Sequence, residues 1–162
     1  MQTAVVRQYY VHHGSLDVPR GAERQYEVAK SYLSRDPIEH RLFQRLEHSS
    51  DGRRYTLQTN DRNQDYFDPR SNTIGWDPYS ALRTTAGGRQ SPALGLGHEI
   101  DHAVESRAKA QRLMNHFNRR YDNAEERRVI LGSETHAART LGEDARHDHG
   151  GSVYRVNSPV QR

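Results

Sequence analysis

The chain has 162 residues, of which 33% are hydrophobic and 28% charged, so it carries enough apolar side chains for one small core. It has no cysteine, which excludes disulfides, thiolate metal ligands and a cysteine nucleophile. The formal net charge is +3, but the arginines are spread along the whole chain, which favours a solvated surface over a nucleic-acid partner. No apolar run is long enough for a transmembrane helix, and the first residues do not resemble a secretory signal, so no membrane partner is expected.

The first part of the chain mixes strand-like and helical patterns. In order, it predicts a strand over 4–12, a loop over 14–21, a helix over 22–33 and a second helix that ends at the break over 49–52. Asp36 followed by Pro37 is a typical helix start, and it predicts that Leu42 and Leu46 face inward from the second helix.

The period of the sequence then changes. Alternating side chains predict three short strands, over 54–59, 64–67 and 73–77. The tight turns between them predict a small antiparallel sheet, with Trp76 in the core. Residues 79–90, which include Gly87-Gly88, are expected to form a flexible connection.

The next pattern predicts a long helix from Pro92 to about Asn115. Ser91 is a good N-cap and Pro92 suits the first helical position. Gly95 and Gly97 leave room for another segment to come close to this helix. Two shorter helices are expected beyond it, one starting at Asn123 and one over 134–141 that Gly142 ends, followed by a polar tail.

The expected long helix carries His98-Glu99-Ile100-Asp101-His102, a His-Glu-x-x-His motif. Histidines four residues apart lie on one face of a helix and can hold one zinc ion (Zn²⁺). Glu99 lies about 100° around the helix from His98, where it can take a proton from a metal-bound water. The motif therefore predicts metal-assisted hydrolysis with Glu99 as the general base.

Two histidines do not complete a catalytic zinc site, which normally has three protein ligands and a water. Without cysteine, the downstream candidates are His116, Glu125, Glu126, Glu134, His136, Glu143, His147 and His149. Position 108 is Ala, so the motif does not extend to the third histidine of the metzincins. Glu126 and Glu134 both begin expected helices. Asn123-x-x-Glu126 also fits a capping box, and spacing alone does not separate these roles.

A group of motifs resembles one known family. His98 to Ala103, Glu125 to Gly132, Ser133-Glu134, Leu141-Gly142 and Arg146 to His149 occur in the order found in the NleD-like family of bacterial effector zinc metalloproteases. The order is also similar to that in the much larger clostridial neurotoxin light chains; both are gluzincins, with two histidines and a glutamate on zinc. The resemblance covers about residues 72–150, roughly half of the chain.

The resemblance implies a role for each matching residue. Glu126 would be the third zinc ligand, and Glu134 would orient a ligand or an arginine. Arg146 would stabilise the oxyanion together with the residue three positions later. That residue is usually Tyr in the relatives and is His149 here, which can also donate a hydrogen bond.

We therefore expect one α+β domain over 1–162 with a zincin-like fold, core motifs at about 72–150 and a polar tail at 151–162. The strand at Thr73, Ile74, Gly75 and Trp76 is expected to be the sheet edge that binds a protein or peptide substrate. The resemblance implies a bacterial effector or toxin domain that is translocated into a target cell, where relatives act on host signalling proteins such as kinases.

The alternative is a binding module without catalysis. It would be either a basic nucleic-acid-associated domain or a domain stabilised by structural zinc. A structural zinc is closed by four protein ligands, and His147 or His149 of the tail would supply the fourth.

Overall fold

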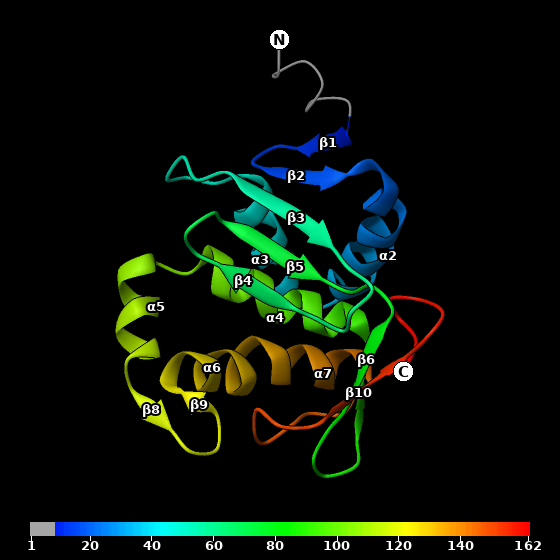
Figure 1. Ribbon diagram of the computed structural model, residues 1–162, viewed down its shortest axis with the longest axis vertical. Coiled ribbons are helices and arrows are strands. Elements are labelled where there is room, and N and C mark those ends of the chain that lie inside the picture. The colour runs from blue at the N-terminus through cyan, green and yellow to red at the C-terminus, as the bar shows by residue number, and fades with distance from the viewer. Residues whose placement is uncertain (1–8) are drawn as a thin grey trace.

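The computed structural model describes residues 9–162 and is mixed α and β with small sheets, as the sequence predicts (Figure 1). The strands are β1 (Tyr10–His13), β2 (Leu16–Pro19), β3 (Tyr55–Thr59), β4 (Tyr66–Asp68), β5 (Thr73–Trp76), β6 (Ser80–Arg83), β7 (Arg89–Gln90), β8 (Phe117–Asn118), β9 (Asp122–Asn123) and β10 (Ser152–Arg155). The helices are η1 (Arg20–Ala22), α2 (Glu23–Leu33), α3 (Pro37–Glu47), α4 (Pro92–Val104), α5 (Arg107–Met114), α6 (Ala124–Val129), η2 (Ile130–Glu134) and α7 (Thr135–Leu141). Part of the strand expected over 4–12 lies outside the described residues.

The main sheet has the strand order β1-β2-β3-β5-β4. Its centre is parallel, because β2 pairs with β3 and β3 with β5 in parallel register, whereas β1 and β4 pair antiparallel at the two edges. The expected antiparallel sheet is therefore wrong for the centre. Helices α2 and α3 lie between β2 and β3 in the chain and supply the long connection that a parallel pair requires.

β5 lies inside this sheet and not at its edge. It pairs with β3 on one side and with β4 on the other, and Ile74 and Trp76 are fully buried. The prediction that Thr73 to Trp76 form the edge strand is therefore wrong. The chain places β4 outside β5, so β4 is the edge strand, and the Tyr66 ring covers Gly75 so closely that a Cβ there would lie 2.1 Å from it.

A second sheet has the strand order β10-β6-β7. Residues 79–90 are thus a hairpin and not the flexible connection expected, and Thr84 N donates to Gly88 O at 2.8 Å to close its turn. β10 comes from the expected polar tail and pairs with β6 over the register Ser152↔Arg83 to Arg155↔Ser80. This long-range pairing holds the end of the chain near the first turns of α4.

α4 runs through the middle of the molecule, between the main sheet and the α6–α7 pair (Figure 1). Ser91 caps it as expected, because its side chain accepts a hydrogen bond from Leu94 N. The helix ends at Val104, well before the expected Asn115. There Arg45 donates to the Val104 carbonyl at 2.7 Å, and Ser106 caps the separate helix α5. The charged residues that follow are therefore a short surface helix.

The remaining helices follow their predicted start and stop residues. The Asp36 side chain accepts from the first backbone N–H groups of α3, and the Asn123 side chain accepts from Glu126 N in α6. α6 and α7 are joined through the wide turn η2 with a kink at Gly132, and Gly142 ends α7 in the left-handed conformation at φ 73°. Within 9–162, every helix is too short or too polar to cross a membrane.

The core of the molecule fixes α4 in place. Leu96 and Ile100 are fully buried, and they belong to one apolar cluster with Phe43 of α3 and Trp76 of β5. Burying each such side chain contributes about 1.5–3 kcal/mol. The Trp76 ring also donates from Nε1 to the Pro92 carbonyl at 2.8 Å, so β5 fixes the first turn of α4.

Candidate metal centre

The two motif histidines and one glutamate meet at a single point. His98 Nε2 lies 3.0 Å from His102 Nε2, because residues four apart lie on one face of α4, where the two rings meet edge to face. Glu126 Oε2 lies 2.9 Å from His98 Nε2 and 3.2 Å from His102 Nε2. Three metal-binding atoms from α4 and α6 therefore converge within hydrogen-bond range of one another.

Glu126 faces the histidines and does not fold back on its own helix. Asn123 Oδ1 accepts from Glu126 N at 2.9 Å, so the cap of α6 is made by the Asn123 side chain. The Glu126 carboxylate is then free to point toward α4. The two roles that spacing leaves open are thus divided, with Asn123 as the cap and Glu126 beside His98 and His102.

Each motif histidine has a second carboxylate behind its ring. His98 Nδ1 lies 2.6 Å from Glu134 Oε2, and His102 Nδ1 lies 3.0 Å from Glu125 Oε2. A carboxylate at Nδ1 keeps the proton on that nitrogen and leaves the Nε2 lone pair directed away. Both lone pairs therefore point at the space that Glu126 also faces.

Two arginines hold these outer carboxylates. Arg146 forms a fork on Glu134, with Nε at 2.6 Å from Oε1 and Nη2 at 3.0 Å from Oε2. Arg128 makes the same kind of fork on Glu125, and its Nη1 lies 2.8 Å from Asp101 Oδ1. Such bidentate pairs fix the carboxylates in plane, so the orientation of both imidazoles is built into the fold.

The electrostatics of this cluster favour a positive charge at its centre. Burial alone would lower the pKa of His98, but the Glu126 and Glu134 carboxylates raise it well above its usual range. Burial is likewise outweighed at His102, where Glu125 and Glu126 raise the pKa to about 9. The same histidines hold the pKa of Glu126 far below its usual range in spite of burial. These groups suit a bound cation, and two imidazoles and a carboxylate at these separations can hold a metal ion.

Glu99 lies beside this cluster, close enough for its carboxylate to be grouped with the two motif histidines. One of its carboxylate oxygens lies within 4.8 Å of ring nitrogens of His98 and His102. Its side chain is buried, and burial raises the pKa of its carboxyl, while His98 and His102 act in the opposite direction. Glu99 is thus placed to exchange a proton with a molecule held between it and the histidines.

Arg146 and His149, the residues expected to stabilise an oxyanion, lie on different sides of His98. Arg146 contacts the Nδ1 side, where its guanidinium is engaged by Glu134. The His149 ring is stacked on the His98 ring, with centroids 6.2 Å apart and planes 11° apart. Its Nε2 lies 3.4 Å from Glu126 Oε2, so His149 faces the same point as the motif histidines.

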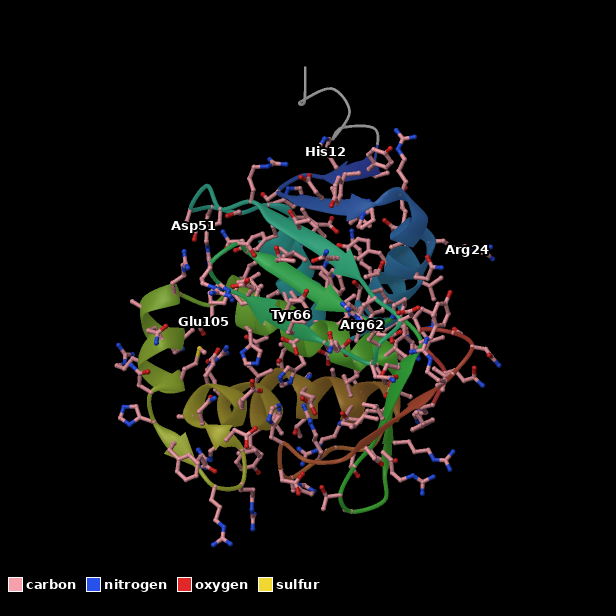
Figure 2. All side chains as sticks on the ribbon, in the orientation of Figure 1. His12, Arg24, Asp51, Arg62, Tyr66 and Glu105 are labelled. Carbon is pink, nitrogen blue, oxygen red and sulfur yellow. The ribbon has the colours of Figure 1, made fainter. Side chains whose placement is uncertain are left out.

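A cleft of about 590 Å³ opens beside the cluster. Glu99, His102 and Glu126 line it, and so do Tyr66 and Glu105, both labelled in Figure 2. A smaller cavity of about 190 Å³ lies on the His98 side. Of the strand expected to bind substrate, none of Thr73, Ile74, Gly75 and Trp76 lines either cavity.

Sequence reasoning missed several members of this site. Glu125 was one of eight candidates, but nothing in the spacing marked it as the partner of His102 Nδ1. Asp65 lines both cavities, accepts from Asp77 N at 2.9 Å, and has a pKa that burial raises to about 8. Its Oδ2 would lie 2.5 Å from a Cβ at Gly95, so that glycine makes room for a carboxyl group. For Glu125, the one signal in the sequence is its position next to Glu126, because adjacent side chains point about 100° apart around a helix.

Comparison of the chain with protein-family models, with curated proteins and with solved structures finds no match.

Proposed function

We propose that the chain is a zinc-dependent endopeptidase. The observation that carries the proposal is the convergence of His98 Nε2, His102 Nε2 and Glu126 Oε2 within 3.2 Å of one another, beside Glu99 and next to a cleft. Ligands about 2.0–2.1 Å from a tetrahedral zinc ion lie about 3.3 Å apart, close to these separations. Zinc is favoured over harder cations because two of the three donors are imidazoles.

Each residue around the centre has its own role in the proposed hydrolysis. When bound, zinc would lower the pKa of a water molecule and polarise a peptide carbonyl. Glu99 accepts the proton of the attacking water and passes it to the leaving amine. Burial raises the pKa of its carboxyl, which helps it to hold the proton between the two steps. Glu134 and Glu125 keep His98 and His102 in the orientation that binding requires.

The edge strand β4 is the proposed place for the substrate backbone. One side of β4 pairs with β5 and the other is open within the described chain, and Tyr66 and Phe67 line the larger cleft. An extended peptide added to this edge would pass over α4 beside Glu99. The apolar part of the wall, with Pro69 and Met114, would accept an apolar side chain of the substrate.

The finer assignments belong to the same proposal. An antiparallel edge strand beside a motif helix and a glutamate from a following helix agree with a zincin-like fold and with the gluzincin ligand set. The resemblance of the motif order to the NleD-like effectors supports a secreted bacterial effector or toxin domain that cleaves a protein in a target cell. Kinases and other host signalling proteins are the substrate class that this resemblance suggests.

A second candidate is a metal-stabilised binding module without catalysis. His149 favours it, because a fourth protein ligand closes a structural zinc site. The two candidates differ in one measurable property, which is turnover. A metal-loaded protein that binds peptides but cleaves none would be the module.

The test combines metal content with peptide cleavage. The purified chain should contain about one zinc per molecule and cleave members of an unstructured peptide library, with cleavage sites read by mass spectrometry. Glu99→Gln is the matched variant, because it should keep the zinc and lose cleavage. Cleavage that persists in Glu99→Gln at the original rate would indicate a contaminating peptidase and contradict the proposal.

A further inference from the structure

Three histidines of this chain share one arrangement. His98 and His102 each have a carboxylate at Nδ1 and direct Nε2 to the centre of the cluster. His149 repeats this pattern: its Nδ1 contacts Asp122, and its Nε2 lies 3.4 Å from Glu126 Oε2. A carboxylate–imidazole pair of this kind is typical of a histidine that binds a metal ion.

We propose that His149 is the fourth protein ligand of the metal ion in the substrate-free protein. The inference rests on the proposed metal centre and deepens it. His98, Glu126 and His149 offer ligand atoms that all lie within 4.8 Å of one another, and His102 Nε2 lies 3.2 Å from the same Glu126 oxygen. Three imidazoles and one carboxylate complete a tetrahedral set.

His149 differs from the other two histidines in how it is held. The His98 and His102 side chains are 5% and 10% exposed and belong to the buried helix α4, whereas the His149 side chain is 31% exposed. It belongs to the loop after Arg146, which is attached to the β8–β9 turn through the His149 N to Arg120 O bond of 3.0 Å. Its partner Asp122 is the first residue of β9, at the end of that turn.

The position of His149 makes it an obstacle to substrate. Together with Asp65 and Glu99, it lines both the cleft of about 590 Å³ and the cavity of about 190 Å³. A peptide that spans the two cavities would therefore contact the His149 ring. Moving the loop away would free the fourth position of the metal ion. His149 would therefore occupy the fourth position of the metal ion in the free protein, and a substrate would have to displace it to reach the ion.

The alternative role for His149 is donation of a hydrogen bond to an oxyanion, without a bond to the metal. Cobalt substitution separates the two roles without measuring activity. In a cobalt(II) protein, the ring N–H proton of each bound imidazole gives a strongly shifted, exchangeable NMR signal. We expect three such signals, from His98, His102 and His149. Only two such signals in the cobalt(II) form of the wild-type protein would overturn the proposal.

Substitutions provide the second readout. His149→Ala should remove one shifted signal, change the visible absorption of the cobalt protein and weaken zinc binding by at least about 10-fold in chelator competition, since loss of an outer partner alone costs about 10–100-fold. Asp122→Asn should give a smaller loss, and Asn suits the left-handed backbone there, at φ 70°. His147→Ala is the control, because His147 is exposed and two residues away. Unchanged zinc affinity in His149→Ala would contradict the fourth-ligand role.

The failure of this inference differs from the failure of the proposed function. If the protein binds no cobalt, the proposed metal centre is itself wrong. If the protein cleaves peptides but shows only two imidazole signals, the proposed peptidase function stands and the fourth-ligand role of His149 is wrong. If the protein shows three imidazole signals but cleaves no peptide, His149 is the fourth ligand and the protein is the binding module.

Discussion

Glu134 Oε2 lies 2.6 Å from His98 Nδ1, on the side of the imidazole opposite Glu126. The two carboxylates therefore contact the same ring in different ways. Glu126 meets the nitrogen that faces the centre, whereas Glu134 holds the other nitrogen and is itself held by Arg146. Burial would raise the pKa of Glu134, but His98 and Arg146 lower it to about 2, so it is an anion at neutral pH.

This geometry predicts an order of metal affinities. Glu126→Gln replaces a proposed ligand and should weaken zinc binding the most. Glu134→Gln and Glu125→Gln remove partners of Nδ1 and should weaken it by about 10–100-fold. Competition with a chelator on the three variants gives the order directly. If Glu134→Gln proves the weakest binder, the third ligand is Glu134 and not Glu126.

Glu99 should separate hydrolysis from metal binding. Glu99→Gln preserves the shape of the side chain but cannot accept a proton, so zinc content should stay at the wild-type level while turnover falls by about 10²–10⁴-fold. His102→Ala should lose both properties. The measurements are zinc by elemental analysis and initial rates on a cleaved peptide. Loss of zinc in Glu99→Gln would mean that Glu99 is itself a ligand.

Local signals predict where several helices start and where α7 ends, but they extend α4 to Asn115, past its observed end at Val104. Asp36-Pro37, Ser91-Pro92 and Gly142 each act within a few residues, so their meaning is independent of the rest of the fold. They correctly place the first residue of α4, and hence the face that carries His98 and His102. The His-Glu-x-x-His spacing is local in the same sense.

Long-range pairing could not be predicted in this way. The sequence predicts a flexible connection at β6, because its partner β10 comes from a polar tail about seventy positions later and no nearby pattern indicates that pairing. The sequence of β5 does not indicate which strand pairs on its outer side, so its position inside the sheet, next to β4, could not be predicted. The roles of Glu125 and Asp122 depend on rings that distant elements bring to them, so they too appear only in the folded chain.

Glu39 leads to a prediction about stability and pH. Its side chain is fully buried on α3, and neither carboxylate oxygen has a hydrogen-bond partner. Burial, together with the nearby Asp101, Asp36 and Glu134, raises its pKa well above the usual value, against the effect of His98. The folded state therefore favours the protonated form, whereas the unfolded chain ionises near pH 4.5.

The sign of the effect follows from these two states. Below the unfolded pKa the carboxyl is protonated in both, and Glu39 adds no pH dependence. As pH rises above that value, ionisation stabilises only the unfolded chain, so the free energy of unfolding falls until the folded pKa is reached. Glu39→Gln should remove this fall. Its urea unfolding free energy relative to wild type should increase from pH 5 to pH 8, and a constant difference would contradict the buried, protonated state.

The contact between Glu39 and Gly97 provides the last prediction. Gly97 lies inside α4, where Ala normally stabilises a helix by about 1 kcal/mol. A Cβ at Gly97 would lie 2.6 Å from Glu39 Oε2, which is too close, and the carboxyl group has no solvent to move into. Gly97→Ala should therefore destabilise the wild-type protein. In a Glu39→Ala background the obstacle is gone, and the same substitution should stabilise by about 1 kcal/mol.

A double-mutant cycle by urea unfolding measures this coupling. Glu39→Ala leaves a cavity and is destabilising by itself, but the cycle compares only the effect of Gly97→Ala in the two backgrounds. Gly21→Ala is the control, because a Cβ there meets nothing within 4 Å, so its effect should be equal in both backgrounds. The sign of the Gly97→Ala effect should reverse when Glu39 is removed. If Gly97→Ala destabilises both backgrounds equally, then the glycine is required by something other than Glu39, and the close packing of α3 against the turn before His98 does not depend on that carboxyl group.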